Sequence, residues 1–400
     1  MKEVKIKKKK AIKKTSKKGG LIRRVKKLLS KKKKTPIKKS SLPKKKRTVT
    51  KRKKKTTLPE IVRAEKFDGN PIIKPSLYFW ETKATFNPAA FLLDNKINLI
   101  YRAIGENDVS MLGYAYTYDG YNIEGRPTYS IYQRYLKPDK TKPNINYISG
   151  GGGFGGCEDP RATIIDDNLY LIYVAFDGWS SIGLNLSSIS LEDFRKRRWN
   201  NWSKPITLSH PGEIHKNWVL FPEKINGKFA ILHSISPDIL IHYFDSFKEF
   251  DGKNFIQSIH RDHPKWQEKE PGVRGAGPTP IKTRLGWLVL YHRTEAHDPH
   301  KYKIFAKILD REDPTKILYQ TDHAIIEPDQ GYEMEGYRGI VYSCGAVVKN
   351  ETLFVYYGAG DKYVGVATIK LDDLLDSMAN KKEIIYVCSK KVRHQPSFNT

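Results

Sequence analysis

Cysteine is scarce in this chain of 400 residues, which contains three: Cys157, Cys344 and Cys388. They are odd in number and far apart, so they provide neither a disulfide framework nor the spacing of a metal site. A reducing compartment is the natural setting, and we predict a cytoplasmic protein. Long apolar runs are missing as well, because no stretch approaches the roughly 20 residues that a membrane-spanning helix needs.

Acidic residues are almost absent from residues 1–57, which hold 29 of the 72 lysines and arginines and a single acid, Glu3. The remaining residues carry 43 basic and 42 acidic side chains, so the net charge of +29 belongs to this first segment. A segment with such dense like charge cannot collapse, and we predict a disordered tail over 1–57. The tail could bind polyanions such as nucleic acid, the ribosome surface or anionic lipid; a solvated extension without a dedicated partner is the alternative.

Residues 58–400 are long enough for one large domain, and they repeat one local pattern five times: a turn, an apolar strand, a polar break and a second strand. The first strands are expected at 97–101, 169–174, 229–233, 287–291 and 353–357. The second strands are expected at 112–116, 182–186, 239–243, 302–308 and 364–369. Helical periodicity is clearest over 371–378.

The copies begin roughly 60–70 residues apart, which is enough for a four-stranded sheet in each. Five such sheets predict an all-β fold, a five-bladed β-propeller over residues 58–400, in which side chains from all blades meet near the central axis. A two-sheet sandwich would explain the strands but not their even spacing.

One stretch combines several chemical signals: Glu158-Asp159-Pro160-Arg161, which follows the glycines of 150–156. Pro160 favours extended geometry at Asp159 and would hold its carboxylate in one direction. The glycines allow close approach of a large ligand, and Arg161 can brace a neighbouring carboxylate through two hydrogen bonds. The stretch indicates an acid beside a substrate cleft, with a glycine-rich loop and a surface salt bridge as the alternative.

Further motifs accompany this stretch in a fixed order between residues 79 and 375. They are Tyr101-Arg102-Ala103, Lys216 to Lys224, Gly275 to Pro280 with Trp287 to His292, and Tyr332-Glu333 with Tyr356 to Asp361. With these motifs the chain resembles glycoside hydrolase family 130, the β-mannoside phosphorylases and related β-mannosidases, which are five-bladed β-propellers.

The resemblance implies cleavage of a β-mannosidic bond with inversion, and Asp159 matches the catalytic acid. In a phosphorylase, inorganic phosphate is the nucleophile and co-substrate, mannose 1-phosphate is the product, and Arg102 and Lys216 match phosphate-binding positions. Contacts to the β-mannoside oligosaccharide or disaccharide, or to phosphate, are implied for Glu158, Arg161, His292, Tyr357 and Asp361. An acid must be protonated when it acts, which requires burial or a neighbouring acid to raise its pKa. Glu158 is a candidate neighbour of Asp159 and Arg161 acts in the opposite sense, so the sequence leaves the direction of the pKa shift open.

A hydrolase remains an alternative to the phosphorylase. Trp179 and serines stand where phosphorylases carry an arginine, although the cluster Arg195 to Arg198 could replace it. A hydrolase needs a base to activate water, and Glu223, Glu333 and Glu335 are the candidates. A non-catalytic propeller directed by its basic tail is a third possibility.

Trp179 and Trp218 could stack on sugar faces, or could be core residues. His260, His263, His297 and His300 are scattered and form no convincing ligand set. We therefore expect no metal and no cofactor apart from phosphate as co-substrate.

Overall fold

The computed structural model describes residues 61–134, 137–260, 263–268, 270 and 272–380. The basic segment 1–57 lies outside the described residues, so its disorder and its polyanion binding stay predictions. Within the described part, strands dominate and the α-helices are α1 (Leu191–Arg195) and α2 (Leu371–Ala379). No helix of this part is long and apolar enough to cross a membrane. The prediction of an all-β fold is confirmed.

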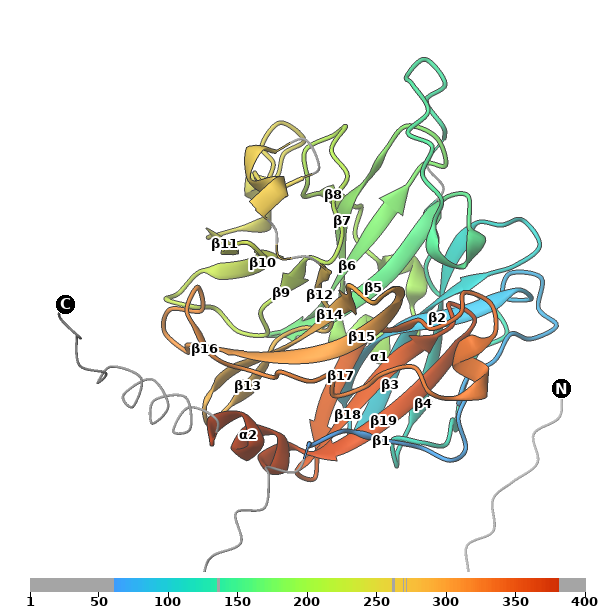
Figure 1. The fold of residues 1–400 in the computed structure, drawn as a ribbon. Helices are drawn as coiled ribbons and strands as arrows, with labels where there is room; N and C mark the ends of the chain where they lie inside the picture. The colour runs from blue at the N-terminus through green and yellow to red at the C-terminus, as the bar shows by residue number, and fades with distance from the viewer. Residues whose placement is uncertain (1–60, 135–136, 261–262, 269, 271, 381–400) are drawn as a thin grey trace, which may run out of the picture. The chain divides into compact units, whose positions relative to one another are not determined.

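The strands of the described residues pair into four sheets (Figure 1). The first sheet contains β2 (Ala84–Leu93), β3 (Lys96–Ile104), β4 (Ser110–Thr117), β5 (Gly156–Ile165), β6 (Asn168–Phe176), β7 (Ile182–Ser190) and β8 (Ile206–Thr207). The second contains β9 (Val219–Leu220), β10 (Phe229–Ile235) and β11 (Ile239–Phe244). The third contains β12 (Val273–Ala276), β13 (Ile281–Thr283), β14 (Gly286–Glu295), β15 (Asp298–Leu309) and β16 (Ile317–Gln320). The fourth contains β17 (Val341–Lys349), β18 (Thr352–Ala359), β19 (Tyr363–Lys370) and β1 (Glu65–Lys66).

All ten strands predicted from the repeated pattern fall within observed strands, and the helix predicted over 371–378 falls within α2. The first and second strand of each copy pair antiparallel as β3–β4, β6–β7, β10–β11, β14–β15 and β18–β19. The hydrophobic pattern and its turns were therefore sufficient to locate these hairpins.

The seven-stranded first sheet consists of two antiparallel groups, β2–β4 and β5–β8. The two groups meet where β4 and β5 pair in parallel, at one register position, Ser110 with Gly156. The strands described here thus fall into five antiparallel groups, in chain order except for β1. That strand pairs with β19, so the beginning and the end of the described chain share a sheet (Figure 1).

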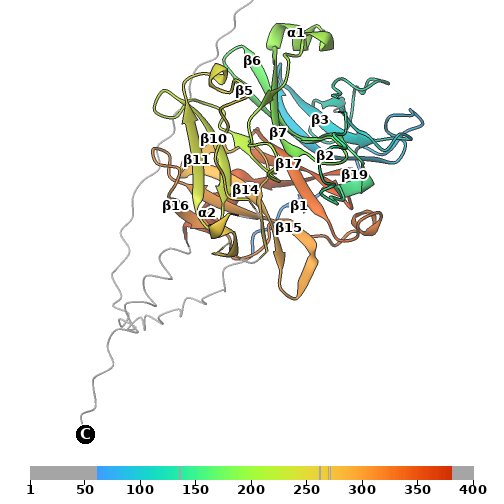
Figure 2. The same cartoon turned by 90° about the horizontal axis from the view of Figure 1, so that it is seen from above.

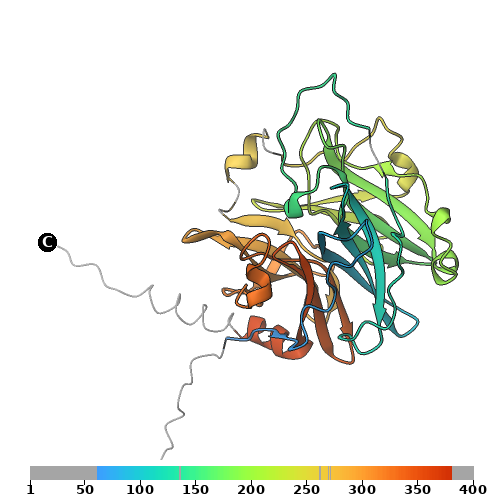
Figure 3. The same ribbon diagram turned by 90° about the vertical axis from the view of Figure 1, so that its right-hand side faces the viewer.

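Apolar side chains fill the spaces between neighbouring groups. Strands β2 and β3 lie between β17–β19 and β5–β7 (Figures 2 and 3), and β3 is buried over nearly its whole length. Ile100 of β3 packs in one cluster with Leu171 of β6, whereas Leu99 packs on the other side with Tyr356 of β18. Each such side chain contributes about 1.5–3 kcal/mol by leaving water. Burial on both faces explains why most residues of β3 are apolar.

Candidate active site

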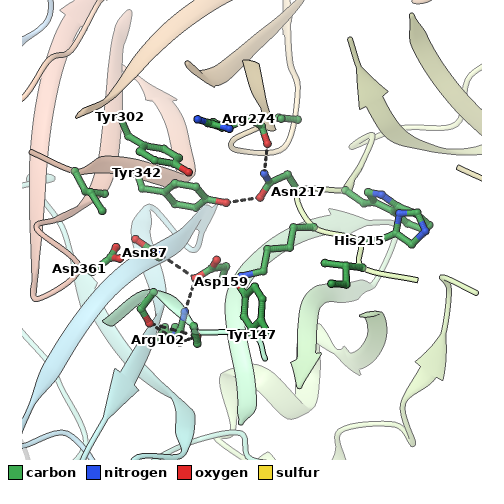
Figure 4. A pocket seen from close by; sticks show the side chains of 18 of the residues that line it. Asn87, Arg102, Tyr147, Asp159, His215, Asn217, Arg274, Tyr302, Tyr342 and Asp361 are labelled. Atoms are coloured by element: carbon green, nitrogen blue, oxygen red, sulfur yellow. Dashed lines mark hydrogen bonds and ion pairs between the residues drawn. The ribbon is translucent and has the colours of Figure 1, made fainter. Parts of the chain in front are cut away.

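A cavity of about 430 Å³ lies where strands of all four sheets come together (Figure 4). The first sheet supplies Asn87 from β2, Arg102 from β3 and Asp159 from β5. The other sheets supply residues of β10, β12, β15 and β17, and Asp361 stands two residues after the end of β18. Side chains that are far apart in sequence therefore converge on one site.

Asp159 lies inside strand β5, not in a loop before a strand, because β5 already begins at Gly156. Its φ is 47°, in the left-handed region, so the expectation of extended geometry at this residue is wrong. The pairing of β5 with β6 shifts register between Glu158 and Arg161, and this bulge overrides the usual effect of Pro160. Such a backbone costs on the order of 1–3 kcal/mol and is typically retained where it places a functional side chain.

Asn87-Pro88 repeats the local structure of Asp159-Pro160. Asn87 also has a φ of 47°, and the pairing of its strand β2 with β3 shifts register at this point. Its amide Nδ2 donates a hydrogen bond of 2.8 Å to Asp159 Oδ1 (Figure 4). Asn87 in the first strand group and Asp159 in the second thus stand at corresponding positions, and their side chains are hydrogen-bonded to each other. Sequence reasoning missed Asn87, although a short polar residue followed by proline, as in Asp159-Pro160, was a usable signal.

Arg102 is a buried cation whose donors are engaged by protein groups. Nη1 lies 3.2 Å from Asp159 Oδ1, and Nε donates to Ser110 Oγ at 3.0 Å. Nη2 donates to Ser149 Oγ at 2.5 Å and to the Gly150 carbonyl at 2.9 Å. In this structure the guanidinium therefore fixes the direction and the charge of Asp159.

Lys216 is the second cation of the cavity and lies beside Tyr147, with Nζ 4.7 Å from the ring centre. Its Nζ is also 3.1 Å from Glu158 Oε2, and 23% of the side chain is exposed. Glu158 itself is fully buried behind the cavity wall, 3.3 Å from Arg102 Nη2, and accepts a hydrogen bond from Ser149. Glu158 is therefore a counterion of both cations.

The electrostatic surroundings lower the pKa of Asp159. Burial raises this pKa, but the positive charges of Arg102, Lys216 and Arg161 and the hydrogen bond from Asn87 outweigh burial. The direction that the sequence left open is therefore a lowered pKa, because Arg102 contacts the carboxylate directly while the charge of Glu158 is neutralised by its own partners.

Asp361 shows the opposite behaviour. Burial, and then the charge of Asp159, raise its pKa to about 6, although Arg102 and Lys216 act against this. The pKa values of these two carboxylates are thus pushed apart, and Asp361 is the one that takes up a proton first as pH falls.

Arg161 lies behind the cavity wall. Its Nη1 donates to the Asp159 carbonyl at 2.8 Å, Nε donates to the Gly277 carbonyl at 3.0 Å, and Nη2 donates to Asn217 Oδ1 at 2.9 Å. Asn217 in turn lines the cavity and accepts a hydrogen bond from Tyr342. Arg161 therefore braces backbone and an amide, and the expected two-point contact to a carboxylate is wrong.

His292 is fully buried and stacks on Tyr342, with ring centres 3.8 Å apart. Its Nε2 accepts the backbone N–H of Ser343 at 3.0 Å. Burial, followed by the charge of Arg161, lowers the pKa of His292 to about 3, so this imidazole is neutral. The structure places His292 behind Tyr342, which itself forms part of the wall.

Tyr357 and Glu333 also stand outside the cavity lining. The Tyr357 hydroxyl donates to Glu333 Oε1 at 2.9 Å and lies 2.8 Å from the Tyr332 hydroxyl. Lys66 Nζ contributes a further hydrogen bond of 2.8 Å to Glu333. This buried glutamate is held as the acceptor of a structural network.

Glu223 and Glu335 are partly exposed and pair with the surface residues Lys282 and Lys362. Neither glutamate lines the cavity. Among the residues that the structure describes, Asp159 and Asp361 are thus the only carboxylates of the cavity wall.

Arg274 is a third cation of the cavity that sequence reasoning missed. It is exposed, precedes Gly275 in β12, and its guanidinium lies 5.7 Å from the ring centre of Tyr302. In the cluster Arg195 to Arg198, the side chains of Arg195 and Arg198 pair with surface carboxylates. No residue of this cluster lines the cavity, and neither does Trp179. Further lining side chains without a sequence signal are Tyr147, His215, Asn217, Tyr337 and Tyr342.

A histidine pair adjoins the cavity but is not a metal site. His215 lines the wall beside Trp218, and Glu213 lies between His215 and His260, 2.7 Å and 3.2 Å from their Nε2 atoms. The described residues contain no group of three or more His, Cys, Asp and Glu side chains that could hold a metal ion.

Residues 50–380 match the family model Glyco_hydro_130, described as beta-1,4-mannooligosaccharide phosphorylase. The chain belongs to glycoside hydrolase family 130. Its resemblance to this family, stated from the motifs, is confirmed.

Family 130 relatives cover most of the chain. A 1,2-beta-oligomannan phosphorylase of Thermoanaerobacter sp. (strain X514) is 33% identical over 327 residues, which are 78% of this chain and 99% of the relative. A beta-1,2-mannobiose phosphorylase of the same organism is 33% identical over 77% of this chain and 97% of that protein. The solved structure of a beta-1,2-mannobiose phosphorylase from Listeria innocua has a TM-score of 0.59 at 22% identity, covering 79% of this chain and 99% of that one. The last comparison concerns the fold alone.

Proposed function

We propose that this protein is an inverting β-mannoside phosphorylase, which uses inorganic phosphate to release mannose 1-phosphate from the end of a β-mannoside. Membership of family 130 supports an enzyme that acts on β-mannosides. The phosphorylase names of relatives that are 33% identical over nearly their whole length support phosphate as the nucleophile.

The single observation that favours a phosphorylase over a hydrolase is the set of charged side chains in the cavity wall. Among the described residues the wall offers two carboxylates, Asp159 and Asp361, against three cations, Arg102, Lys216 and Arg274. An inverting hydrolase needs an acid and a separate base that activates water, whereas phosphate is itself the nucleophile. A wall rich in cations favours binding of a phosphate dianion.

In the proposed reaction, a phosphate oxygen bonds to the anomeric carbon while the bond from that carbon to the leaving oxygen breaks. Asp159 gives its proton, through a mannose hydroxyl, to the leaving oxygen, so the products are α-mannose 1-phosphate and a shortened acceptor. The low pKa of Asp159 means that its carboxylate must gain a proton before it can act as the acid. Phosphate close to Lys216 would offset the charge of one of the cations that lower this pKa, so binding of the nucleophile would favour protonation of the acid.

Roles for the remaining predicted residues follow from their positions. Asp361 is suited to hold hydroxyls of the donor mannose, because it lines the cavity and carries a proton up to about pH 6. Glu158 and Arg161 are better placed to position Asp159 than to contact a substrate. His292 and Tyr357 support the wall from behind.

The five-bladed propeller is part of the proposal. Five antiparallel strand groups, the single bridge between β4 and β5, and the pairing of β1 with β19 favour it over a sandwich. The likeness to the Listeria enzyme supports a shared fold. A cytoplasmic location, inferred from the few cysteines, also remains a prediction.

A β-1,2-linked mannoside is the first substrate to test, since both relatives at 33% identity are named for 1,2-linkages. We expect β-1,2-mannobiose to yield mannose 1-phosphate only when inorganic phosphate is present. Lys216→Gln should raise the KM for phosphate by tenfold or more, because a charge-assisted contact is worth about 1.5–3 kcal/mol. Free mannose formed at the same rate with and without phosphate would identify a hydrolase and overturn the proposal.

A further inference from the structure

A second cavity, of about 520 Å³, shares no lining residue with the first. It lies between the segment 129–134 and the turn 197–202 that follows α1. The segment is tied to β4, since the N–H of Leu112 donates to the Tyr132 carbonyl at 2.9 Å. Both walls therefore belong to the described fold.

The described side chains that line this cavity include many hydrogen-bond donors and no carboxylates. Arg134, Arg197 and Arg198 contribute three guanidinium groups, and no Asp or Glu of the described residues lines the space. Arg198 pairs with Glu192 and Asp193 outside the cavity. Arg197 has no ion pair or hydrogen bond from its side chain to the described residues, so its charge is available to a ligand.

Three buried donors at the same place have no acceptor in the protein. They are the indole Nε1 of Trp199, the indole Nε1 of Trp202 and Nε of Arg134. Trp202 is only 6% exposed, so its N–H is withdrawn from bulk water. Buried donors are nearly always paired, and an unpaired group calls for an acceptor from outside the chain.

The walls hold these donors in fixed positions. Trp202 packs edge-on to Tyr132 at 5.3 Å between ring centres, and Trp199 contacts Tyr114 at 5.6 Å. Arg134 stacks over the Tyr132 ring at 5.2 Å. A rigid arrangement loses little entropy when a ligand binds, which is typical of a preformed site.

We propose that this second cavity binds the phosphoryl group of a small ligand, either inorganic phosphate or a sugar phosphate. Guanidinium groups match phosphoryl oxygens through paired hydrogen bonds, and the indole N–H groups supply further donors to the same acceptors. The volume also accommodates a monosaccharide ester, whose ring could lie against Tyr129 or Trp199. The inference stands on this cavity alone and does not depend on the reaction at the first cavity.

Calorimetric titration of the full-length protein tests the proposal, with inorganic phosphate, α-mannose 1-phosphate and mannose as separate ligands. The Lys216→Gln background weakens binding at the first cavity and so separates the two sites. In that background, we expect phosphoryl binding to persist and to become about tenfold weaker when Arg197→Gln is added, the loss of one charge-assisted contact. Trp199→Phe keeps the ring, removes the N–H donor, and should weaken binding in the same direction.

Arg195→Gln is the matched control, because Arg195 is the last residue of α1, two positions before Arg197, pairs with Asp94 and does not line the cavity. Tighter binding of mannose 1-phosphate than of phosphate would identify an ester as the ligand, and the reverse order would identify the free anion. Three results would overturn the proposal: loss of all phosphoryl binding in the Lys216→Gln background, equal weakening by Arg195→Gln and Arg197→Gln, or binding of mannose as tight as that of its phosphate. Failure of the proposed reaction would instead appear as missing product and would leave this titration unchanged.

Discussion

Two carboxylates of the cavity, Asp159 and Asp361, differ in pKa because their neighbours differ. Asp159 contacts Arg102 at 3.2 Å, and its pKa lies below the usual range. Asp361 has no such contact, and burial and the charge of Asp159 raise its pKa to about 6. When two carboxyl groups have separated pKa values, a proton binds first to the group with the higher pKa. A charged ligand that changes these pKa values can then move the proton to the other group.

Asp361→Asn tests this assignment through the pH dependence of stability. The pKa of Asp361 is higher in the folded protein than the ordinary value of 3.8, so its contribution favours the folded state below about pH 4 and is lost as pH rises through about 6. We expect the wild type to lose about 3 kcal/mol of unfolding free energy from this group between pH 4 and pH 7. Asn accepts the left-handed backbone at this position, where φ is 52°, so the variant should fold and show a flatter profile.

Urea unfolding of residues 58–400 at several pH values provides the measurement. Asp372→Asn is the control, because this carboxylate is exposed on α2 and pairs with Arg284. An Asp361→Asn profile with the same slope as the wild type would contradict the assignment.

At the residue scale, the sequence motifs predicted which residues line the cavity, but they did not predict the ionisation behaviour of those residues. Asp159, Arg102, Lys216 and Asp361 were all predicted, and all line one cavity. The direction of the pKa shift of Asp159 was left open, since a sequence does not give the distance to a cation. Arg274 was missed because the motif that carries the family resemblance begins one residue later, at Gly275.

At the scale of elements, bulged strands build the site. Register shifts occur in β2, β5, β12 and β17, and each of these strands contributes a residue to the cavity wall. A bulge interrupts the regular alternation of side chains between the two faces of a sheet, and so can direct a side chain into the cavity between the strands. Hydrophobic periodicity predicted all ten strands of the hairpins, but it contains no information on where a strand gains a residue.

Gly358→Ala is predicted to damage the site through the packing of β18 on β2. A Cβ at Gly358 would lie 2.0 Å from Asn87 Oδ1 and 2.9 Å from the Asn87 backbone nitrogen. Because Asn87 is held in its bulge, relief would displace its amide from Asp159 and should cost about 1–3 kcal/mol of stability. The loss of activity should exceed what the loss of stability explains. We therefore expect a lower kcat than in the wild type when it is measured under conditions in which the variant remains folded.

Gly331→Ala is the matched control, since nothing lies within 4 Å of a Cβ at that position. Its unfolding free energy should stay within about 0.5 kcal/mol of the wild type. Full activity in Gly358→Ala would show that the contact between Asn87 and Asp159 is dispensable.

At the scale of the whole molecule, charge separates the basic segment 1–57 from the nearly neutral remainder. Deletion of 1–57 should leave kcat and KM unchanged and should remove binding to polyanions that is sensitive to salt. Heparin retention at rising salt, measured beside turnover, provides the test. Loss of turnover on deletion would show that this segment takes part in the reaction, contrary to the prediction.

The central claim is that phosphate attacks the mannoside with inversion while Asp159 protonates the leaving oxygen. The most direct test is an NMR time course with β-1,2-mannobiose and inorganic phosphate, which records the first-formed anomer. We predict that α-mannose 1-phosphate forms first, requires phosphate, and is lost in a folded Asp159→Asn variant. The β-anomer as first product, free mannose without phosphate, or undiminished turnover by Asp159→Asn would contradict the claim.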